Sequence, residues 1–376
     1  MNIQDPLQLL GGISPHTFMQ RYWQKKPLLI RQAIPGFAPI LERIELMDLA
    51  AQEDVESRLV VQDLSGKGSG WKFKQGPFGR KAIPPFKQAG WTLLVQGVDL
   101  HDERMHGLIN QFRFVPDARL DDVMISYATD QGGVGPHFDS YDVFLLQAHG
   151  RRRWRIGRQK DLSLREDLPL KILANFEPEE EFVLEPGDML YLPPKYAHDG
   201  IAEGDCMTYS IGFRAPSQAE LAQELLQRLS EQAAEDLPAT LYSDPKQPAV
   251  EGSGSMPAAM LEFAQAAVHA ALKDPKSVAR ALGEYLSEPK AQVWFDGEGR
   301  AADGAIRLDR RSRMLYDEHH VFINGESFLA AGRDARLMRR LADQRSLSAL
   351  EVRRLSAGAL ELVQDWCDAG WLHVED

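Results

Sequence analysis

The chain has 376 residues, of which 44% are hydrophobic and 26% are charged, and its formal net charge at pH 7 is −12. This length predicts two or three folded units, and the composition is that of an ordinary globular protein. The negative charge argues against broad nucleic-acid binding, which needs a basic surface to displace counterions. It suits instead either solubility or the capture of a basic partner, such as a cationic peptide.

Cysteine usage and hydropathy indicate a compartment. Cys206 and Cys367 are the two cysteines of the chain, and they lie far apart in no metal-type spacing. A disulfide framework is therefore not expected, and a reducing cytoplasm fits this usage. The sequence opens without the basic-then-apolar pattern of a secretion signal, and no apolar run reaches membrane-spanning length. We expect a cytoplasmic protein without a membrane partner.

Residues 1–216 are predicted to form a strand-rich domain. A helix is expected at His16–Gln24. It should end before Pro27, because proline disfavours helix in the residue that precedes it. The strand candidates are short, apolar and separated by glycine or proline turns: Leu28–Ile30, Trp91–Val98, Val123–Tyr127, Tyr141–Ala148, Arg152–Ile156, Glu181–Leu184, Met189–Leu192 and Met207–Phe213. Many short strands of this kind predict a barrel or a sandwich.

Residues 217–288 change to a helical pattern. Ser217 and Glu220 have the spacing of a capping box, and apolar residues then recur at helical intervals. After a proline- and glycine-rich loop, Pro257–Ala271 and Pro275–Leu286 are also predicted to be helices. One face of this small unit is too apolar to stand alone. We therefore expect it to pack against a second copy as the dimerisation region of a homodimer.

Residues 289–376 mix strands and helices. Asn324-Gly325 lies between two short apolar runs and predicts a hairpin with a type I′ turn. Helices are expected at Asp334–Ala342 and Ser348–Cys367, the latter breaking near Ala357, before a strand at Trp371–Val374. This order of elements is similar to a winged-helix domain.

The run Gly135–Asp139 places His137 and Asp139 two positions apart. On a strand such residues point to the same face and can hold one ion. An isolated His-x-Asp is common by chance, but here a glycine-rich turn precedes it and an apolar run follows. His198, just after the stiff pair Pro193-Pro194, is the candidate third ligand. Two histidines and one carboxylate leave coordination positions open and favour non-haem Fe(II) oxygenase chemistry.

Arg152 is the candidate anchor for a cosubstrate. Strict alternation along Arg151–Arg155 puts Arg152 on the same face as Trp154. A buried arginine is costly unless it meets an anion, and it could bind the distal carboxylate of 2-oxoglutarate through two parallel hydrogen bonds. The alternative is a structural salt bridge with a core carboxylate. Ser126 could add a hydroxyl hydrogen bond, although an ordinary strand serine would explain it nearly as well, and Thr208 and Ser210 are weaker candidates of the same kind.

These motifs resemble the bacterial JmjC-type ribosomal oxygenases. The similar segments are Gly135–Phe144, Gly150–Trp154, Glu185–His198, Trp23–Pro27 and Tyr209–Pro216. Among members of that family, the chain resembles most those that hydroxylate an arginine of a ribosomal protein. The resemblance is strong through about residue 216 and fainter beyond it.

The resemblance implies a mainly β fold with added helices. That fold is a double-stranded β-helix (cupin or JmjC domain) over 1–216, a helical dimerisation region over 217–288 and a winged-helix-like domain over 289–376. The resemblance also implies that His137, Asp139 and His198 bind Fe(II), and that Arg152 with Ser126 binds 2-oxoglutarate, with O2 as the second cosubstrate. The implied reaction hydroxylates the β-carbon of an arginine in a basic, large-subunit ribosomal protein. Direct nucleic-acid binding is not expected.

Other functions remain open from the sequence. A cupin metalloenzyme without 2-oxoglutarate, such as an isomerase, could use the same three ligands, although a buried Arg152 would then lack an anion. A non-catalytic ribosome-binding module would use the C-terminal domain as its working part. Within the oxygenase class, a histidyl or asparaginyl hydroxylase or a demethylase is also compatible with these residues.

Overall fold

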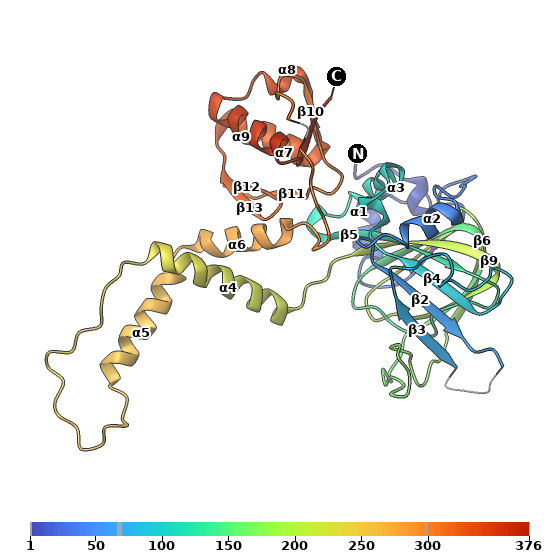
Figure 1. The fold of residues 1–376 in the computed structure, drawn as a ribbon, viewed down its shortest axis with the longest axis horizontal. Coiled ribbons are helices and arrows are strands. Elements are labelled where there is room, and N and C mark those ends of the chain that lie inside the picture. The colour runs from blue at the N-terminus through green and yellow to red at the C-terminus, as the bar shows by residue number, and fades with distance from the viewer. Residues whose placement is uncertain (1, 66–69, 298, 376) are drawn as a thin grey trace. The chain divides into compact units, whose positions relative to one another are not determined.

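The computed structural model describes residues 2–65, 70–297 and 299–375. The chain divides into two compact units, Met1–Ala215 and Pro216–Asp376 (Figure 1). Each unit has its own hydrophobic core. None of the helices in the described ranges is long and apolar enough to cross a membrane.

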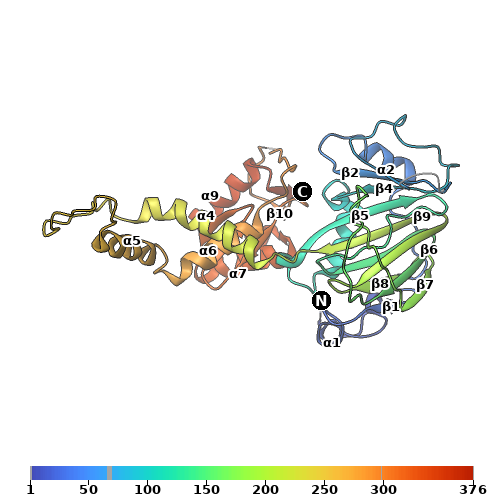
Figure 2. The same ribbon diagram turned by 90° about the horizontal axis from the view of Figure 1, so that it is seen from below.

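The first unit is built on one nine-stranded sheet with the order β1-β8-β6-β9-β5-β4-β2-β3, in which β7 also pairs with β6. The strands are β1 (Leu28–Ile30), β2 (Ser57–Gln62), β3 (Trp71–Gln75), β4 (Trp91–Val95), β5 (Leu120–Ala128), β6 (Val143–Gly157), β7 (Glu180–Leu184), β8 (Met189–Leu192) and β9 (Ala197–Phe213). The long strands β6 and β9 pair along nearly their whole length, with register shifts beside His149. Such bulges bend strands, and Figure 2 shows the sheet rolling up around them.

Strand β6 joins two segments that the sequence predicted as separate strands. Gly150 lies between the two predicted strands, has a φ of +61° and belongs to the bulge. A Cβ there would stand 2.1 Å from the carbonyl oxygen of Asp205, so only glycine lets the two strands stay paired through the bulge. The barrel-type prediction is confirmed, whereas β2 and β3 were missed.

Side chains on β6 alternate between two cores. Phe144 and Leu146 face the main core, which lies between the sheet and the N-terminal segment and includes Phe18 and Tyr191. The intervening residues face a second cluster that contains Trp154. This period of two assigns one face of the rolled sheet to stability and leaves the other free to line a site.

Three α-helices flank the sheet: α1 (Pro15–Arg21), α2 (Arg43–Leu49) and α3 (Glu103–Ile109). The Ser14 side chain caps α1 by accepting a hydrogen bond from the backbone N–H of Thr17, and Pro15 occupies its first turn. The helix ends at Arg21, three residues earlier than predicted. Gln24 adopts a left-handed conformation, with a φ of +56°, as the chain turns toward β1.

The second unit opens with three helices, α4 (Gln218–Asp236), α5 (Ala258–Ala271) and α6 (Pro275–Ser287). The predicted capping box at the start of α4 is present, since Ser217 and Glu220 exchange their side-chain and backbone hydrogen bonds. Helices α4 and α6 are joined by a hydrogen bond of 2.6 Å from the Tyr285 hydroxyl to Glu220 Oε1. By contrast, α5 buries none of its described side chains within the unit.

The remainder of this unit carries two three-stranded sheets and three helices. Its elements are β10 (Ala305–Leu308), β11 (Met314–Tyr316), β12 (His320–Ile323), β13 (Glu326–Leu329), α7 (Gly332–Gln344), β14 (Ser346–Leu347), α8 (Ala349–Val352), α9 (Ala357–Asp368) and β15 (Leu372–Glu375). The predicted hairpin is confirmed as β12–β13, and both Asn324 and Gly325 have the positive φ that a type I′ turn requires. The predicted helix break near Ala357 is also confirmed, as the gap between α8 and α9.

Candidate active site

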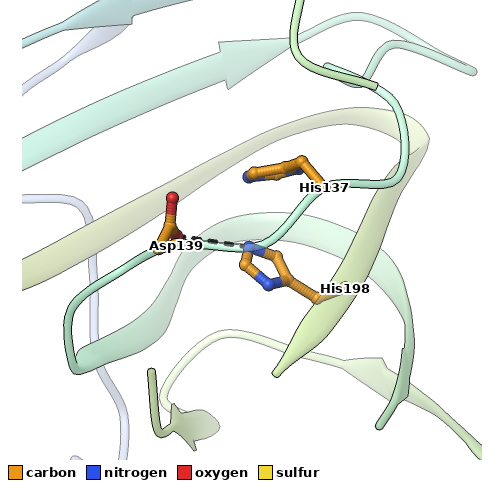
Figure 3. Close-up of side chains that lie close together, drawn as sticks. All are labelled: His137, Asp139 and His198. Atoms are coloured by element: carbon orange, nitrogen blue, oxygen red, sulfur yellow. Dashed lines mark ion pairs between the residues drawn. The ribbon is translucent and has the colours of Figure 1, made fainter. Parts of the chain in front are cut away.

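His137, Asp139 and His198 converge at one point of the first unit (Figure 3). The prediction that His137 and Asp139 lie on a strand is wrong, because both lie in the loop between β5 and β6. A backbone bridge replaces the strand: His137 N–H donates to the carbonyl of His198 at 3.0 Å, and His198 N–H donates back at 2.8 Å. The Lys195 N–H also donates to the carbonyl of Asp139 at 2.7 Å. These bonds tie the loop to the start of β9 and to the turn before it.

The ligand atoms of the three residues lie within 4.8 Å of one another. His198 Nε2 is 3.6 Å from Asp139 Oδ2, and the two imidazole rings lie 4.2 Å apart. Nδ1 of His137 lies 2.9 Å from the carbonyl of Gly135, and Nδ1 of His198 lies 3.0 Å from that of Tyr196. Since a carbonyl only accepts, both Nδ1 atoms carry a proton, which leaves Nε2 of each ring as the atom available to a metal.

The electrostatics of the cluster suit a cation. Burial lowers the pKa of His198 to about 4, and the neighbouring His137 adds to this effect. At neutral pH His198 is therefore a neutral imidazole, the form that coordinates a metal. Two imidazole nitrogens and one carboxylate, oriented by their outer hydrogen bonds, match the donor set of a non-haem Fe(II) site. In the described part of the chain, no other group of three such side chains converges in this way.

The connection between β6 and β7 supports this loop from outside. Gly135 has a φ of +81°, and a Cβ there would lie 2.7 Å from Cδ1 of the buried Ile172. The Leu173 N–H donates to the carbonyl of Pro136 at 2.8 Å. The loop that carries His137 and Asp139 thus rests on residues that follow it by more than 30 positions, and the sequence carried no signal for this contact.

Arg152 is 3% exposed and reaches the same cavity as the metal-binding cluster. Its Nη1 donates to the hydroxyls of Ser126 at 2.9 Å and Thr208 at 3.4 Å, and its Nη2 donates to the carbonyl of Gly200 at 3.1 Å. All three are neutral oxygens, and no carboxylate of the described residues forms an ion pair with Arg152. Burial lowers the pKa of its guanidinium. The alternative of a structural salt bridge finds no partner here, so the site fits an anionic ligand.

The cavity has a volume of about 500 Å³ and extends past the arginine and the metal-binding cluster. Its lining includes two acids of β5, Asp121 and Asp122, and the aromatic ring of Tyr141. Burial, together with the carboxylate of Asp139, raises the pKa of the Tyr141 hydroxyl, which therefore stays protonated. The lining thus carries charges of both signs, since Arg58 and Lys171 also belong to it.

Sequence reasoning missed several of these residues. Gln147 Oε1 accepts a hydrogen bond of 2.9 Å from the Thr208 hydroxyl and so orders the group that contacts Arg152. Its signal was a single polar residue within the apolar run of β6. Asp121 and Asp122 likewise stood out as paired acids at the start of an apolar strand.

The rolled sheet and its cluster of two histidines and one carboxylate define the class of the first unit, which is a cupin-type, JmjC oxygenase domain. A family model described as "JmjC domain" matches residues 107–221. A second model, "ROXA-like winged helix", matches residues 270–373.

The chain belongs to the ribosomal oxygenase family. It is 36% identical over 284 residues to "Ribosomal protein uL16 3-hydroxylase" of Escherichia coli (strain K12), covering 73% of this chain and 72% of that protein. It is 30% identical to "Probable ribosomal oxygenase" of Haemophilus influenzae over 96% of both chains.

The solved structures agree with this assignment. The fold matches the crystal structure of E. coli ycfD with a TM-score of 0.82 at 29% identity, over 96% of this chain and 98% of that one. A second structure, of YcfD in complex with cobalt and 2-oxoglutarate, matches with a TM-score of 0.77 over the same shares. The chain is a 2-oxoglutarate-dependent dioxygenase that uses Fe(II) and O2.

Proposed function

We propose that this enzyme hydroxylates carbon 3, the β-carbon, of an arginine side chain in the large-subunit ribosomal protein uL16. The substrate protein and the carbon number follow the name of the E. coli relative. The arginine follows the motif resemblance around His137 and Asp139. The observation that carries the proposal is one cavity in which two histidines and a carboxylate converge beside a buried arginine that forms no ion pair with a described carboxylate.

In this proposal His137, Asp139 and His198 hold Fe(II), and Arg152 with Ser126 binds the distal carboxylate of 2-oxoglutarate. When bound, the iron supplies the oxidation in which O2 and 2-oxoglutarate give succinate, CO2 and one oxygen atom inserted into a C–H bond. The chain positions the reactants and excludes water. Arg152 anchors the cosubstrate, and apolar side chains of the lining such as Val143 and Leu145 reduce the water around the reacting atoms.

The acidic part of the cavity supports an arginine as substrate. Asp121 and Asp122 line the wall, and Tyr141 offers an aromatic face. A guanidinium is planar, permanently charged and well suited to carboxylates and aromatic faces. The net charge of −12 also favours the approach of a basic ribosomal protein.

The direct test is anaerobic loading with Fe(II), followed by O2, 2-oxoglutarate and purified uL16, with the intact mass of uL16 as the readout. We expect a gain of one oxygen atom, located on an arginine by fragmentation. The variants His137→Ala and Asp139→Ala should abolish this gain and the formation of succinate. His149→Ala is the matched control, because His149 lies on β6 but outside the metal-binding cluster.

The alternatives are distinguished by the same spectra. Oxygen on a histidine or asparagine would assign a different hydroxylase, and loss of a methyl group would assign a demethylase. Wild-type enzyme that forms no succinate and modifies no ribosomal protein would contradict the proposal.

We further propose that the enzyme is a homodimer and that the helical region 217–288 holds its two copies together. Exposed apolar side chains are concentrated on and beside α5: Met256, Met260, Leu261, Phe263, Val268 and Leu272. An apolar helix of which no described side chain is buried needs a partner, and a second copy offers the same face.

A further inference from the structure

Trp154 lies between the arginine and one of the metal-binding histidines. Its ring centroid is 5.0 Å from the guanidinium carbon of Arg152 and 5.8 Å from the centroid of the His198 ring. All three residues line the same cavity. The ladder explains this arrangement, because Trp154 pairs with Gly200 on β9 while His198 pairs with Ile156, the next inward-facing position of β6.

Gly200 lies on the neighbouring strand β9, paired with Trp154. A Cβ at Gly200 would lie 2.6 Å from Cζ3 of Trp154 and 2.7 Å from Nε of Arg152. Both distances are far below van der Waals contact. The absence of a side chain at this position therefore allows the indole and the guanidinium to share the space beside the β9 backbone.

The contacts of Trp154 come from its ring. The indole Nε1 is buried but has no hydrogen-bond partner among the described residues. The guanidinium of Arg152, by contrast, is held by hydrogen bonds at Nη1 and Nη2, while its Nε is unpartnered. The aromatic face thus supplies a contact to a cation whose remaining partners are all neutral oxygens.

We infer that Trp154 is a positioning residue that fixes the guanidinium of Arg152 for binding the 2-oxoglutarate carboxylate and orients it relative to His198. This inference rests on the proposed role of Arg152. The face of the indole stabilises the cation in the absence of a bound anion and restricts the plane in which the guanidinium presents its two N–H groups. The residue acts through Arg152 and makes no contact with the reacting atoms.

The test compares Trp154→Phe with Trp154→Leu. We expect the leucine variant to raise KM for 2-oxoglutarate about tenfold, the scale of a lost cation–π contact at a desolvated site, with kcat changed less than about twofold. The phenylalanine variant keeps a ring face and should stay within about threefold of wild type. Anaerobic titration of the Fe(II)-loaded enzyme with 2-oxoglutarate, followed by visible absorption, gives the same affinity without turnover.

Phe182→Leu is the matched control. Phe182 lies opposite Trp154 on β7 and packs against the same apolar cluster, but it contacts neither Arg152 nor a metal-binding residue in the described contacts. It should lower the melting temperature without changing the affinity for 2-oxoglutarate. Gly200→Ala is a second perturbation of the same contact and should weaken 2-oxoglutarate binding even if Trp154→Leu does not fold.

Unchanged 2-oxoglutarate affinity in folded Trp154→Leu, or in Gly200→Ala if the leucine variant does not fold, would overturn the inference. So would a phenylalanine variant as impaired as the leucine variant, because the ring face would then not be the part that matters. Failure of the underlying function looks different: wild type would form no succinate, or Arg152→Ala would bind 2-oxoglutarate normally.

Discussion

At the scale of single residues, the charge on Arg152 decides how the cavity works. An arginine that is 3% exposed and bonded to neutral oxygens loses hydration without gaining a carboxylate. Burying this charge lowers the stability of the free protein. A ligand that supplies an anion offsets this cost when it binds. The same reasoning makes the hydroxyls of Ser126 and Thr208 part of a cradle, since they orient the guanidinium without neutralising it.

We predict that Arg152→Ala raises KM for 2-oxoglutarate by about 100-fold, because two charge-assisted hydrogen bonds of roughly 1.5 kcal/mol each are lost. Arg152→Lys should recover part of this loss, as it keeps the charge but not the two parallel donors. Steady-state succinate formation measures both variants. Arg153→Ala is the control, because that side chain pairs with Glu181 and Glu203 on the outer face. Equal effects of Arg152→Ala and Arg153→Ala would contradict the anchor role.

We also predict that Gly135→Ala weakens Fe(II) binding by at least about tenfold, since strain and overpacking each cost roughly 1 kcal/mol or more. The alanine would adopt a φ of +81° and press against Ile172, moving the loop that carries His137. Gly204→Ala separates the two causes. Gly204 has a similar φ of +76° but no heavy atom within 4 Å of its Cβ position. Calorimetric titration with Fe(II) under argon measures both, and a normal affinity in Gly135→Ala would refute the proposed support.

The candidate metal ligands were predicted from the His-x-Asp spacing together with the turns and apolar runs around it, and their role as ligands stays a prediction. His137, Asp139 and His198 were all singled out, and the structure brings them together. What the sequence could not give is the reason they converge. The spacing of His137 and Asp139 suggested a strand. In the structure, the two backbone hydrogen bonds between His137 and His198 and the packing of Ile172 beside Gly135 hold the loop in place. Contacts between distant segments leave no periodic signature.

At the scale of elements, hydrophobic periodicity predicted strands and helices correctly where each of them faces a single core. The hairpin β12–β13 and the helices α5 and α6 were predicted closely, because turn chemistry and spacing act within a few residues. Strand β2 was missed although it is apolar, and β3 carries Trp71-Lys72-Phe73-Lys74, a half-exposed alternation that a loop could also show. Pairing with neighbouring strands decides such cases.

The helix pair α8 and α9 bears on the expectation that nucleic acid is not bound. In a helix-turn-helix the second helix reads the groove, close to the phosphates. Helix α9 carries Glu361, Asp365 and Asp368 and no basic residue. This charge disfavours contact with phosphates. The absence of direct nucleic-acid binding stays a prediction, since helix α7 of the same unit carries four arginines, Arg333, Arg336, Arg339 and Arg340.

We predict that the second unit loses stability in acid through Asp309. Burial alone would raise the pKa of Asp309, but hydrogen bonds from Arg311 at 2.7 Å and His373 at 2.8 Å outweigh it and hold the pKa well below the usual 3.8. A carboxyl whose folded pKa is depressed contributes stability above its unfolded pKa. That contribution is lost as the pH falls below 3.8 toward the folded value.

Asp309→Asn should therefore lower the free energy of unfolding by about 2 kcal/mol at pH 7, and by progressively less below pH 4. Urea unfolding of the full chain at both pH values, followed by circular dichroism, provides the measurement. Glu361→Gln, an exposed acid of α9, is the control and should change little at either pH. A constant difference between wild type and Asp309→Asn across this range would show that titration of Asp309 is not involved.

At the scale of the whole molecule, the sequence indicated an oxygenase domain followed by helical and winged-helix regions, and the family match confirms the two outer parts. The middle could be assigned only as helical. An apolar face without a partner in its own chain looks the same in sequence whether it packs inward or against another copy. The structure argues against inward packing, because none of the described side chains of α5 is buried in the second unit.

We therefore predict that the wild-type enzyme is a dimer at micromolar concentration and that Leu261→Glu combined with Val268→Glu makes it a monomer. The two residues lie seven positions apart on α5 and are 50% and 60% exposed, so they share one face. A carboxylate buried in an apolar interface costs several kcal/mol, which raises the dissociation constant by at least about 100-fold. Sedimentation equilibrium measures the dissociation constant of the dimer. Leu329→Glu is the control, since that residue is 82% exposed on β13 and outside the helical region. A monomeric wild type, or a double variant that remains dimeric, would contradict the proposal that α5 packs against a second copy.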